Sequence, residues 1–268
     1  MRSFAYHRPG SLDEALALLG DEEARPLAGG MTLLPVMKQR LAMPDALVDL
    51  AAIDLAGIAR SGDHIVVGAM TRHAAVAASP LVRAAIPALA DLAGGIGDPA
   101  VRNRGTIGGS IANADPAADY PAAVLGLGAT VVTSAREIAG DDYFTALFET
   151  ALAPGELVTA VRFPVPFAAA YAKFASPASR FAIVGVFVAR FAGGVRVAVT
   201  GAAASVFRVT AMEAALAERF DPSAIEGIGV PAEGLNGDIH ADAHYRAHLV
   251  GVMARRAVAA ASGSAGRV

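Results

Sequence analysis

The stretch GDPAVRNRGTIGGSIANADPAAD, residues 97–119, combines four glycines with hydroxyl, amide and charged side chains in a chain of 268 residues. Gly108 and Gly109 stand at a predicted helix start, and Thr106 and Ser110 flank them with hydroxyl groups. Glycine lets main-chain N–H groups approach a ligand closely, and the first turn of a helix leaves N–H groups free to bind anions. The stretch has neither the lysine of a Walker loop nor the spacing of a dinucleotide fingerprint. We therefore expect a different kind of anion cradle here.

A second glycine-rich joint, AGGMTLLPV, lies upstream at residues 28–36. Its two glycines follow a predicted strand over 24–28 and precede a helix that we expect to start at the capping residue Thr32 and to end at Pro44. One face of that helix would hold Leu33, Leu34, Met37 and Leu41. Two glycine-rich, anion-binding loops in one chain predict one ligand with a pyrophosphate, which the two loops would hold from opposite sides. From these residues alone, glycines that only serve tight turns remain an alternative.

Composition excludes several classes of function. No cysteine is present, which rules out disulfides, thiolate nucleophiles and cysteine-bound clusters in this chain. The formal net charge is -3 without a basic stripe, so we expect no nucleic-acid partner. No apolar run approaches the ~20 residues of a transmembrane segment, and the start lacks a secretory signal, so we expect a cytoplasmic protein. Scattered histidines predict solvated or helix-capping roles and no metal site: His64, His73, His240, His244 and His248.

The hydrophobic pattern divides the chain into three blocks. Residues 1–55 predict α/β structure, with a first helix capped by Ser11 and supported by Glu14 three residues later. Residues 56–167 predict hairpins and short helices, among them one helix over 80–95. Residues 168–268 predict a meander that turns at Gly193 and Gly194, a helix with a Thr210/Glu213 capping box, and a long terminal helix.

These motifs resemble a known family over essentially the whole chain. AGGMTLLPVMKQRLAMPDALVDL and GDPAVRNRGTIGGSIANADPAADYPA, with ALFETALAPGELVTAVRFP and YAKFASPASRFAIVGV, are similar to the FAD-binding medium subunit of the molybdenum hydroxylases, in the carbon monoxide dehydrogenase-like branch of the xanthine dehydrogenase family. The resemblance implies an α+β fold. It places a two-subdomain FAD-binding domain of the vanillyl-alcohol oxidase (PCMH) type over 1–167, divided near residue 55, and a small sheet-plus-helices domain over 168–268.

The resemblance also implies a set of cofactor-binding residues and no catalytic residue or metal ligand in this chain. Ile96 would flank the FAD, Asp119 would hydrogen-bond toward it, Val158 would pack beside it, and Lys173 would lie near the isoalloxazine ring. The alternative for Lys173 is a strand lysine that faces water. The implied FAD-binding residues are Leu27, Ala28, Gly29, Gly30, Met31, Thr32, Leu33, Leu34, Ile96, Thr106, Ile107, Gly108, Gly109, Asn113, Asp115, Asp119, Val158 and Lys173.

Two details of the cradles leave roles open. Met31 stands where the family usually has a polar residue, so main-chain donors would have to suffice there and FAD affinity would be lower than usual. Arg102 and Arg104 would either face phosphate or an iron–sulfur partner, or brace the loop through Asp98 or Asp115.

The resemblance implies partners as well. A large subunit would bind molybdopterin and a small subunit would hold iron–sulfur clusters, in a dimer of heterotrimers that passes electrons through this chain's FAD to an external acceptor. A free-standing flavin oxidase and a scaffold subunit that has lost FAD are the two alternatives. The substrate of the assembled enzyme, whether carbon monoxide, an aldehyde or an N-heterocycle, stays open.

Overall fold

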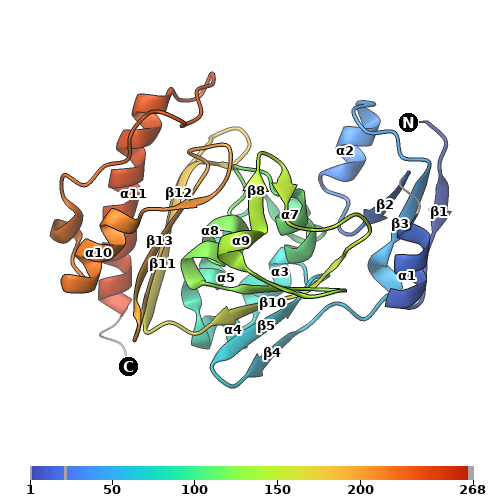
Figure 1. The fold of residues 1–268 in the computed structure, drawn as a ribbon, viewed down its shortest axis with the longest axis horizontal. Helices are drawn as coiled ribbons and strands as arrows, with labels where there is room; N and C mark the ends of the chain where they lie inside the picture. Colours follow the sequence, from blue (N-terminus) through green and yellow to red (C-terminus); the bar gives the residue numbers. More distant parts are fainter. Residues whose placement is uncertain (1, 21–22, 265–268) are drawn as a thin grey trace.

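A computed structural model describes residues 2–20 and 23–264. Three larger β-sheets follow one another along the molecule, each built from a continuous part of the chain, and a two-stranded sheet accompanies the second (Figure 1). The first sheet and its helices form a separate N-terminal lobe, while the second and third sheets share the central helices between them (Figure 1). The mixed helix and sheet content agrees with the predicted α+β class. The predicted domain limits stay a prediction, although the first and second sheets end at Asp49 and Pro164.

The N-terminal lobe is a small parallel sheet with a helix against it. Its elements are β1 (Ala5–His7), α1 (Leu12–Leu19), β2 (Ala24–Leu27), α2 (Leu33–Lys38), β3 (Ala46–Asp49) and the 3-10 turn η1 (Leu50–Ala52). The strand order is β1-β3-β2. Ser11 caps α1 as predicted, because its hydroxyl accepts a hydrogen bond from the Glu14 N–H at 3.2 Å. Ala15 and Leu19 of α1 pack with Val48 in the core of the lobe.

Helix α2 corrects the predicted second helix. It ends at Lys38 rather than near Pro44, because Arg40 adopts a left-handed conformation with a φ of 62°. Thr32 makes no capping hydrogen bond, and Leu41 is 75% exposed instead of sharing a buried face. Only Met37 of the predicted face is buried. The spacing of apolar residues therefore predicted too long a helix, because the left-handed conformation at Arg40 ends the helical backbone.

The central part consists of a five-stranded antiparallel sheet and short helices. The strands are β4 (Ile58–Ser61), β5 (His64–Gly68), β6 (Thr130–Thr133), β7 (Glu137–Ala139) and β10 (Val158–Pro164), in the order β4-β5-β10-β6-β7. The helices are α3 (His73–Ala78), α4 (Pro80–Ala85), α5 (Pro87–Gly94), α6 (Pro99–Arg102), α7 (Ile107–Asn113), α8 (Tyr120–Leu127) and α9 (Gly140–Tyr143). A hairpin, β8 (Phe144–Ala146) and β9 (Glu149–Thr150), projects from them. The single helix predicted over 80–95 is wrong, because Pro87 breaks it into α4 and α5.

The C-terminal part is an antiparallel sheet covered on both faces. Strands β11 (Ala168–Ala175), β12 (Ala182–Phe191), β13 (Gly194–Thr200) and β14 (Phe207–Arg208) are followed by α10 (Thr210–Glu218), η2 (Pro222–Ile225) and α11 (Ala243–Ser264). Phe187 of β12 packs in the central core, while Val186 and Val188 pack with α10 and α11. Because successive strand residues point to opposite faces, this double cover explains the nearly continuous apolar run of β12.

The predicted capping box of α10 is absent. Glu213 does not reach back to the helix start; its carboxylate accepts a hydrogen bond from the Val197 N–H at 2.9 Å and pairs with Arg208 at 2.6 Å. Thr210 makes no cap, and the helix begins after Val209. Glu213 thus attaches α10 to β13 instead of closing the helix end.

Candidate functional site

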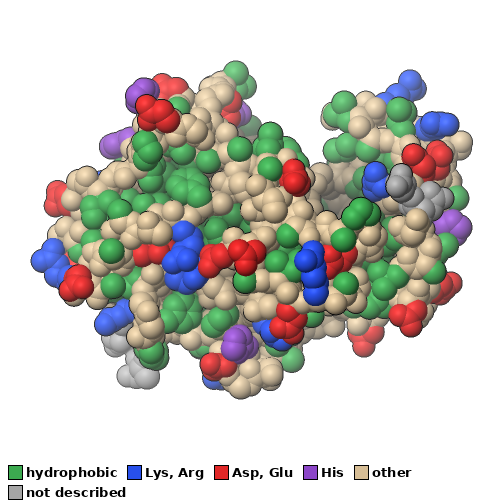
Figure 2. Space-filling model, viewed as in Figure 1, with side chains coloured by type: hydrophobic (Ala, Val, Ile, Leu, Met, Phe, Trp, Pro, Cys, Tyr) green, Lys and Arg blue, Asp and Glu red, His purple; other side chains and the backbone are tan. Residues whose placement is uncertain are grey.

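A cavity of about 480 Å³ lies where the N-terminal lobe meets the central helices. Figure 2 shows the surface hollowed between these two parts of the molecule. The predicted residues that line this cavity come from five separate segments and are Ala28, Gly29, Gly30, Met31, Thr32, Leu33, Ile96, Thr106, Gly108, Gly109, Asn113, Asp115, Asp119 and Val158. Leu27, Leu34, Ile107 and Lys173 do not line it. Folding therefore brings both glycine-rich loops to one cavity.

The first loop offers unpaired main-chain donors. The N–H groups of Gly29, Gly30, Met31 and Thr32 make no hydrogen bond to any residue that the structure describes. Gly30 has a φ of +72°, a conformation that favours glycine. A Cβ atom on Gly29 would overlap the carbonyl oxygen of Arg104, so glycine is required where the two loops touch. Free donors on a bare backbone facing a cavity suit a bound anion.

The second loop is different, and here the sequence interpretation needs correction. The Gly108 N–H donates to the Ala69 carbonyl at 2.9 Å, and the Gly109 N–H donates to the Thr106 hydroxyl at 3.2 Å. These donors are therefore not free for phosphate. A Cβ atom on Gly108 would lie 2.6 Å from the Ala69 Cβ, which makes this glycine a packing requirement. Neither glycine has a positive φ, so the alternative of a tight turn is also wrong.

Polar side chains on the cavity wall supply further groups for a ligand. Thr32, Ser110 and Asn113 make no side-chain hydrogen bond within the described residues. Met31 lines the cavity and is 37% exposed, so its side chain adds apolar surface beside the free N–H groups. The loop can therefore bind an anion through its backbone while the side chains Ser110 and Asn113 approach from α7.

A buried ion pair fixes one end of the cavity. Lys173 Nζ lies 3.0 Å from Asp119 Oδ1, and the Tyr171 hydroxyl donates to the same carboxylate at 2.5 Å. Burial raises the pKa of Asp119, while the charge of Lys173 and the hydrogen bond from Tyr171 oppose that rise. Lys173 also donates to the carbonyls of Gly95 and Arg180, at 2.9 and 3.1 Å.

The alternative of a water-facing Lys173 is therefore wrong, because its side chain is only 12% exposed. The lysine does not reach the cavity wall itself. It holds three segments that do contribute to that wall: Ile96–Gly97, Asp119 and Ser179–Phe181. Sequence reasoning missed this last segment, because no pattern in residues 176–181 marks it as a ligand contact.

His73 is the cavity residue whose predicted role was wrong. It is 5% exposed rather than solvated, and its Nδ1 atom has no hydrogen-bond partner among the described residues. Burial, together with the nearby charge of Arg102, lowers the pKa of His73 to about 4, so the imidazole is neutral near pH 7. The ring packs against Tyr120 with centroids 5.3 Å apart. His73 therefore contributes a neutral ring to the cavity lining, while its unpaired Nδ1 atom stays buried in the protein.

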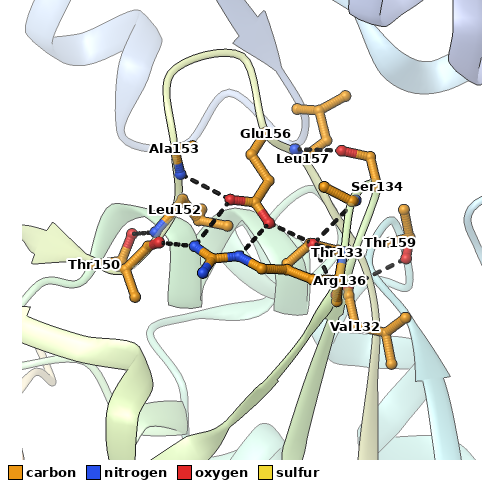
Figure 3. Close-up of polar contacts among 12 residues, drawn as sticks. Val132, Thr133, Ser134, Arg136, Thr150, Leu152, Ala153, Glu156, Leu157 and Thr159 are labelled. Carbon is orange, nitrogen blue, oxygen red and sulfur yellow. Dashed lines mark hydrogen bonds and ion pairs between the residues drawn. The ribbon is translucent and has the colours of Figure 1, made fainter.

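The loop before Val158 is held by the network in Figure 3. The Glu156 carboxylate accepts hydrogen bonds from the Thr133 hydroxyl at 2.5 Å, the Ala153 N–H at 2.8 Å and Arg136 at 3.2 Å. Burial opposes ionisation of Glu156, but these bonds lower its pKa below the usual value. Since Leu157 and Val158 follow directly and line the cavity, this network determines where the wall lies.

The two arginines of the second loop do not brace it through Asp98 or Asp115, and they take different positions. Arg102 donates to the carbonyls of Ile96 and Gly97, at 2.9 and 3.2 Å, so it braces the loop through main-chain oxygens and not through a carboxylate. Asp98 instead caps α6 through the Val101 N–H. Arg104 points away from the cofactor cavity into a second cleft.

Taken together, the cavity fits an elongated ligand with an anionic centre. The loop donors suit a pyrophosphate, the side chains of Ser110 and Asn113 suit polar groups of the same ligand, and the wall is mostly apolar elsewhere. The FAD-binding domain of molybdopterin dehydrogenases matches residues 2–166. The chain belongs to this FAD-binding family. Its FAD-binding fold, its oxidoreductase class and its role as a flavin subunit, all expected from the sequence, are thereby confirmed.

Individual relatives support the same assignment. The medium chain of carbon monoxide dehydrogenase from Afipia carboxidovorans is 39% identical over 96% of both chains. The medium subunit of nicotine 6-hydroxylase from Paenarthrobacter nicotinovorans is 35% identical over 94% of this chain and 95% of the relative. Among solved structures, carbon monoxide dehydrogenase from Hydrogenophaga pseudoflava matches with a TM-score of 0.89, 37% identity and 98% coverage of both chains.

No helix in the part of the chain that the structure describes is long and apolar enough to cross a membrane. Within the same residues, no group of three or more histidine, aspartate and glutamate side chains is arranged to hold a metal ion.

Proposed function

We propose that this chain is the flavin subunit of a three-component molybdenum hydroxylase. A large subunit would bind molybdopterin, and a small subunit would hold the iron–sulfur clusters that deliver electrons. The observation that carries the proposal is the cavity with free N–H groups at Gly29–Thr32, in a chain that matches medium chains of such enzymes over nearly its full length. With no cysteine, the chain has no thiolate to hold a cluster of its own.

Bound FAD supplies the redox chemistry, and the protein supplies position and electrostatics. We assign the main-chain donors of Gly29–Thr32 to the pyrophosphate and the polar side chains of α7 to neighbouring groups of the cofactor. Asp119 is held in place by Tyr171 and Lys173, so its carboxylate presents a fixed acceptor to the cavity. Three predicted apolar residues that line the cavity, Leu33, Ile96 and Val158, would exclude water from the cofactor.

Substrate choice belongs to the large subunit in this proposal. Related chains include the medium chains of carbon monoxide dehydrogenase, nicotine 6-hydroxylase and glyceraldehyde dehydrogenase. Similar flavin subunits are expected in enzymes with such different substrates if the substrate never contacts the flavin subunit. We further propose a cytoplasmic dimer of heterotrimers that passes electrons to an external acceptor.

Reconstitution tests the proposal. The purified chain should bind one FAD noncovalently, and acid precipitation should release all of the flavin into the supernatant. The chain has no cysteine for a covalent link, and neither glycine-rich loop contains a histidine. The chain alone should not oxidise carbon monoxide, an aldehyde or a purine, and turnover should appear only with both partner subunits. A yellow precipitate would contradict noncovalent binding, and turnover by the chain alone would favour a free-standing oxidase. A colourless protein that ignores added FAD would favour a scaffold.

A further inference from the structure

A second cleft, of about 920 Å³, borders the cofactor cavity. Four residues line both, so they form the wall between them: Ala28, Gly29, Met70 and Thr106. The cleft lies at the carboxyl ends of the parallel strands, because Arg8 follows β1, Ala28 follows β2 and Asp49 ends β3. In open parallel sheets, this edge is where binding sites form.

Three arginines from three separate segments line this cleft. Arg8, Arg72 and Arg104 are exposed, and none of their guanidinium groups makes a hydrogen bond or an ion pair with a residue that the structure describes. The one carboxylate on the lining, Asp49, is already engaged by the Tyr6 hydroxyl and by the Ala51 N–H at 2.9 Å. Among the described residues, the lining therefore carries three arginine charges against one carboxylate, so its net charge is positive.

The polar groups inside the cleft are not free to orient a small molecule. The Thr71 hydroxyl exchanges hydrogen bonds with the N–H and carbonyl of Gly57, at 2.9 and 3.0 Å. The hydroxyls of Ser79 and Thr106 each accept a bond from their own helix. Small-molecule sites normally combine an apolar pocket with a few convergent polar groups. Here the unpaired groups are the charges at the exposed arginines, which is typical of a protein-docking surface.

We propose that this arginine cleft, defined by Arg8, Arg72 and Arg104, docks an acidic segment of a partner subunit of the hydroxylase. The inference rests on the proposed function, which requires partner subunits. Complementary charge sets the rate and register of such an association. Because the cleft shares a wall with the cofactor cavity, a subunit docked there lies next to the FAD-binding loops.

Charge reversal tests the docking surface. The triple variant Arg8→Glu, Arg72→Glu, Arg104→Glu changes only exposed side chains, so its FAD content and melting temperature should match the wild type. Its Kd for the purified pair of partner subunits should rise at least about tenfold at about 0.15 M salt, where opposite charges still attract across short distances. The matched control Arg60→Glu, Arg219→Glu, Arg256→Glu makes the same charge change at other exposed sites and should assemble like the wild type.

The outcomes separate this inference from the proposed function. A wild-type chain that does not associate with the partner subunits contradicts the proposed function itself. A wild-type chain that associates, with a cleft variant that binds as tightly as the control, overturns the docking inference alone. Calorimetry with inorganic phosphate and with ATP tests a third possibility. If either anion binds saturably to the wild type but not to the cleft variant, and assembly is unchanged, the cleft is a small-anion site and the docking inference is overturned. If the glutamate variant unfolds, the corresponding glutamine variant is measured with the same expectations.

Discussion

Mild acid should destabilise this protein through one buried histidine. The pKa of His73 falls from an ordinary value of about 6.5 to about 4 on folding, because the imidazole is buried, at 5% exposed, and lies near the charge of Arg102. The unfolded chain therefore binds the proton more tightly than the native protein does. The stabilising effect of a neutral His73 is complete above about pH 6.5 and is lost as the pH falls through the interval to about 4.

The size of the effect follows from the two pKa values. The full difference is about 3 kcal/mol, and about 2 kcal/mol of it should be lost on going from about pH 7.5 to about pH 5. Urea unfolding of the FAD-free protein at both pH values measures the loss. The variant His73→Leu removes the titrating group, so its own loss between the two pH values should be smaller than that of the wild type by about 2 kcal/mol.

The comparison is made within each variant, so a change in absolute stability caused by the substitution does not matter. His244→Gln, on an exposed face of α11, serves as the control and should show the same pH dependence as the wild type. An equal loss in His73→Leu and wild type would refute the reasoning. It would mean that the imidazole is protonated, or solvated, in the native protein.

Three further predictions follow from the cavity wall. Gly109→Val should leave a folded, helical protein whose FAD affinity falls at least ~100-fold, about 2.7 kcal/mol, because the added side chain would crowd Thr106 and Ala28 on the cavity wall. Gly108→Val should also unfold the central part, because its Cβ meets Ala69. Circular dichroism and flavin fluorescence titration separate the two outcomes. Lys173→Met leaves Asp119 buried without its cation, so the free energy of unfolding measured in urea should fall by about 3–5 kcal/mol. Adding Asp119→Asn to this variant should recover part of that loss. If the effects of the two substitutions on the free energy of unfolding simply add, the pairing is contradicted. Glu156→Gln should lower the free energy of unfolding by about 1–3 kcal/mol near pH 7. It should also weaken FAD binding, because Val158 on the cavity wall would no longer be held in place. An unchanged melting temperature would show that the network in Figure 3 does not stabilise the protein.

Local sequence signals predicted much of the architecture. Ser11 and Glu14 predicted the start of α1, and the glycine turn at 193–194 predicted the hairpin of β12 and β13. These features depend on residues within a few positions of one another, so the chain specifies them locally. The predictions for residues 32–44 and 80–95 were wrong because the apolar pattern alone favours longer helices. The left-handed backbone at Arg40 ends the first helix, and Pro87 divides the second.

The sequence alone was enough to assign the family and to show that no cysteine ligand is present, and it predicted residues of two long motifs that line the cavity. Tertiary structure alone decided which donors in those motifs are free: Gly29 and Gly30 keep theirs, while Gly108 gives its N–H to Ala69. It also decided that His73 is buried and that Lys173 pairs with Asp119 across 54 positions in the chain. Hydrogen bonds and desolvation depend on which distant segments pack together, and no short window of sequence contains that information.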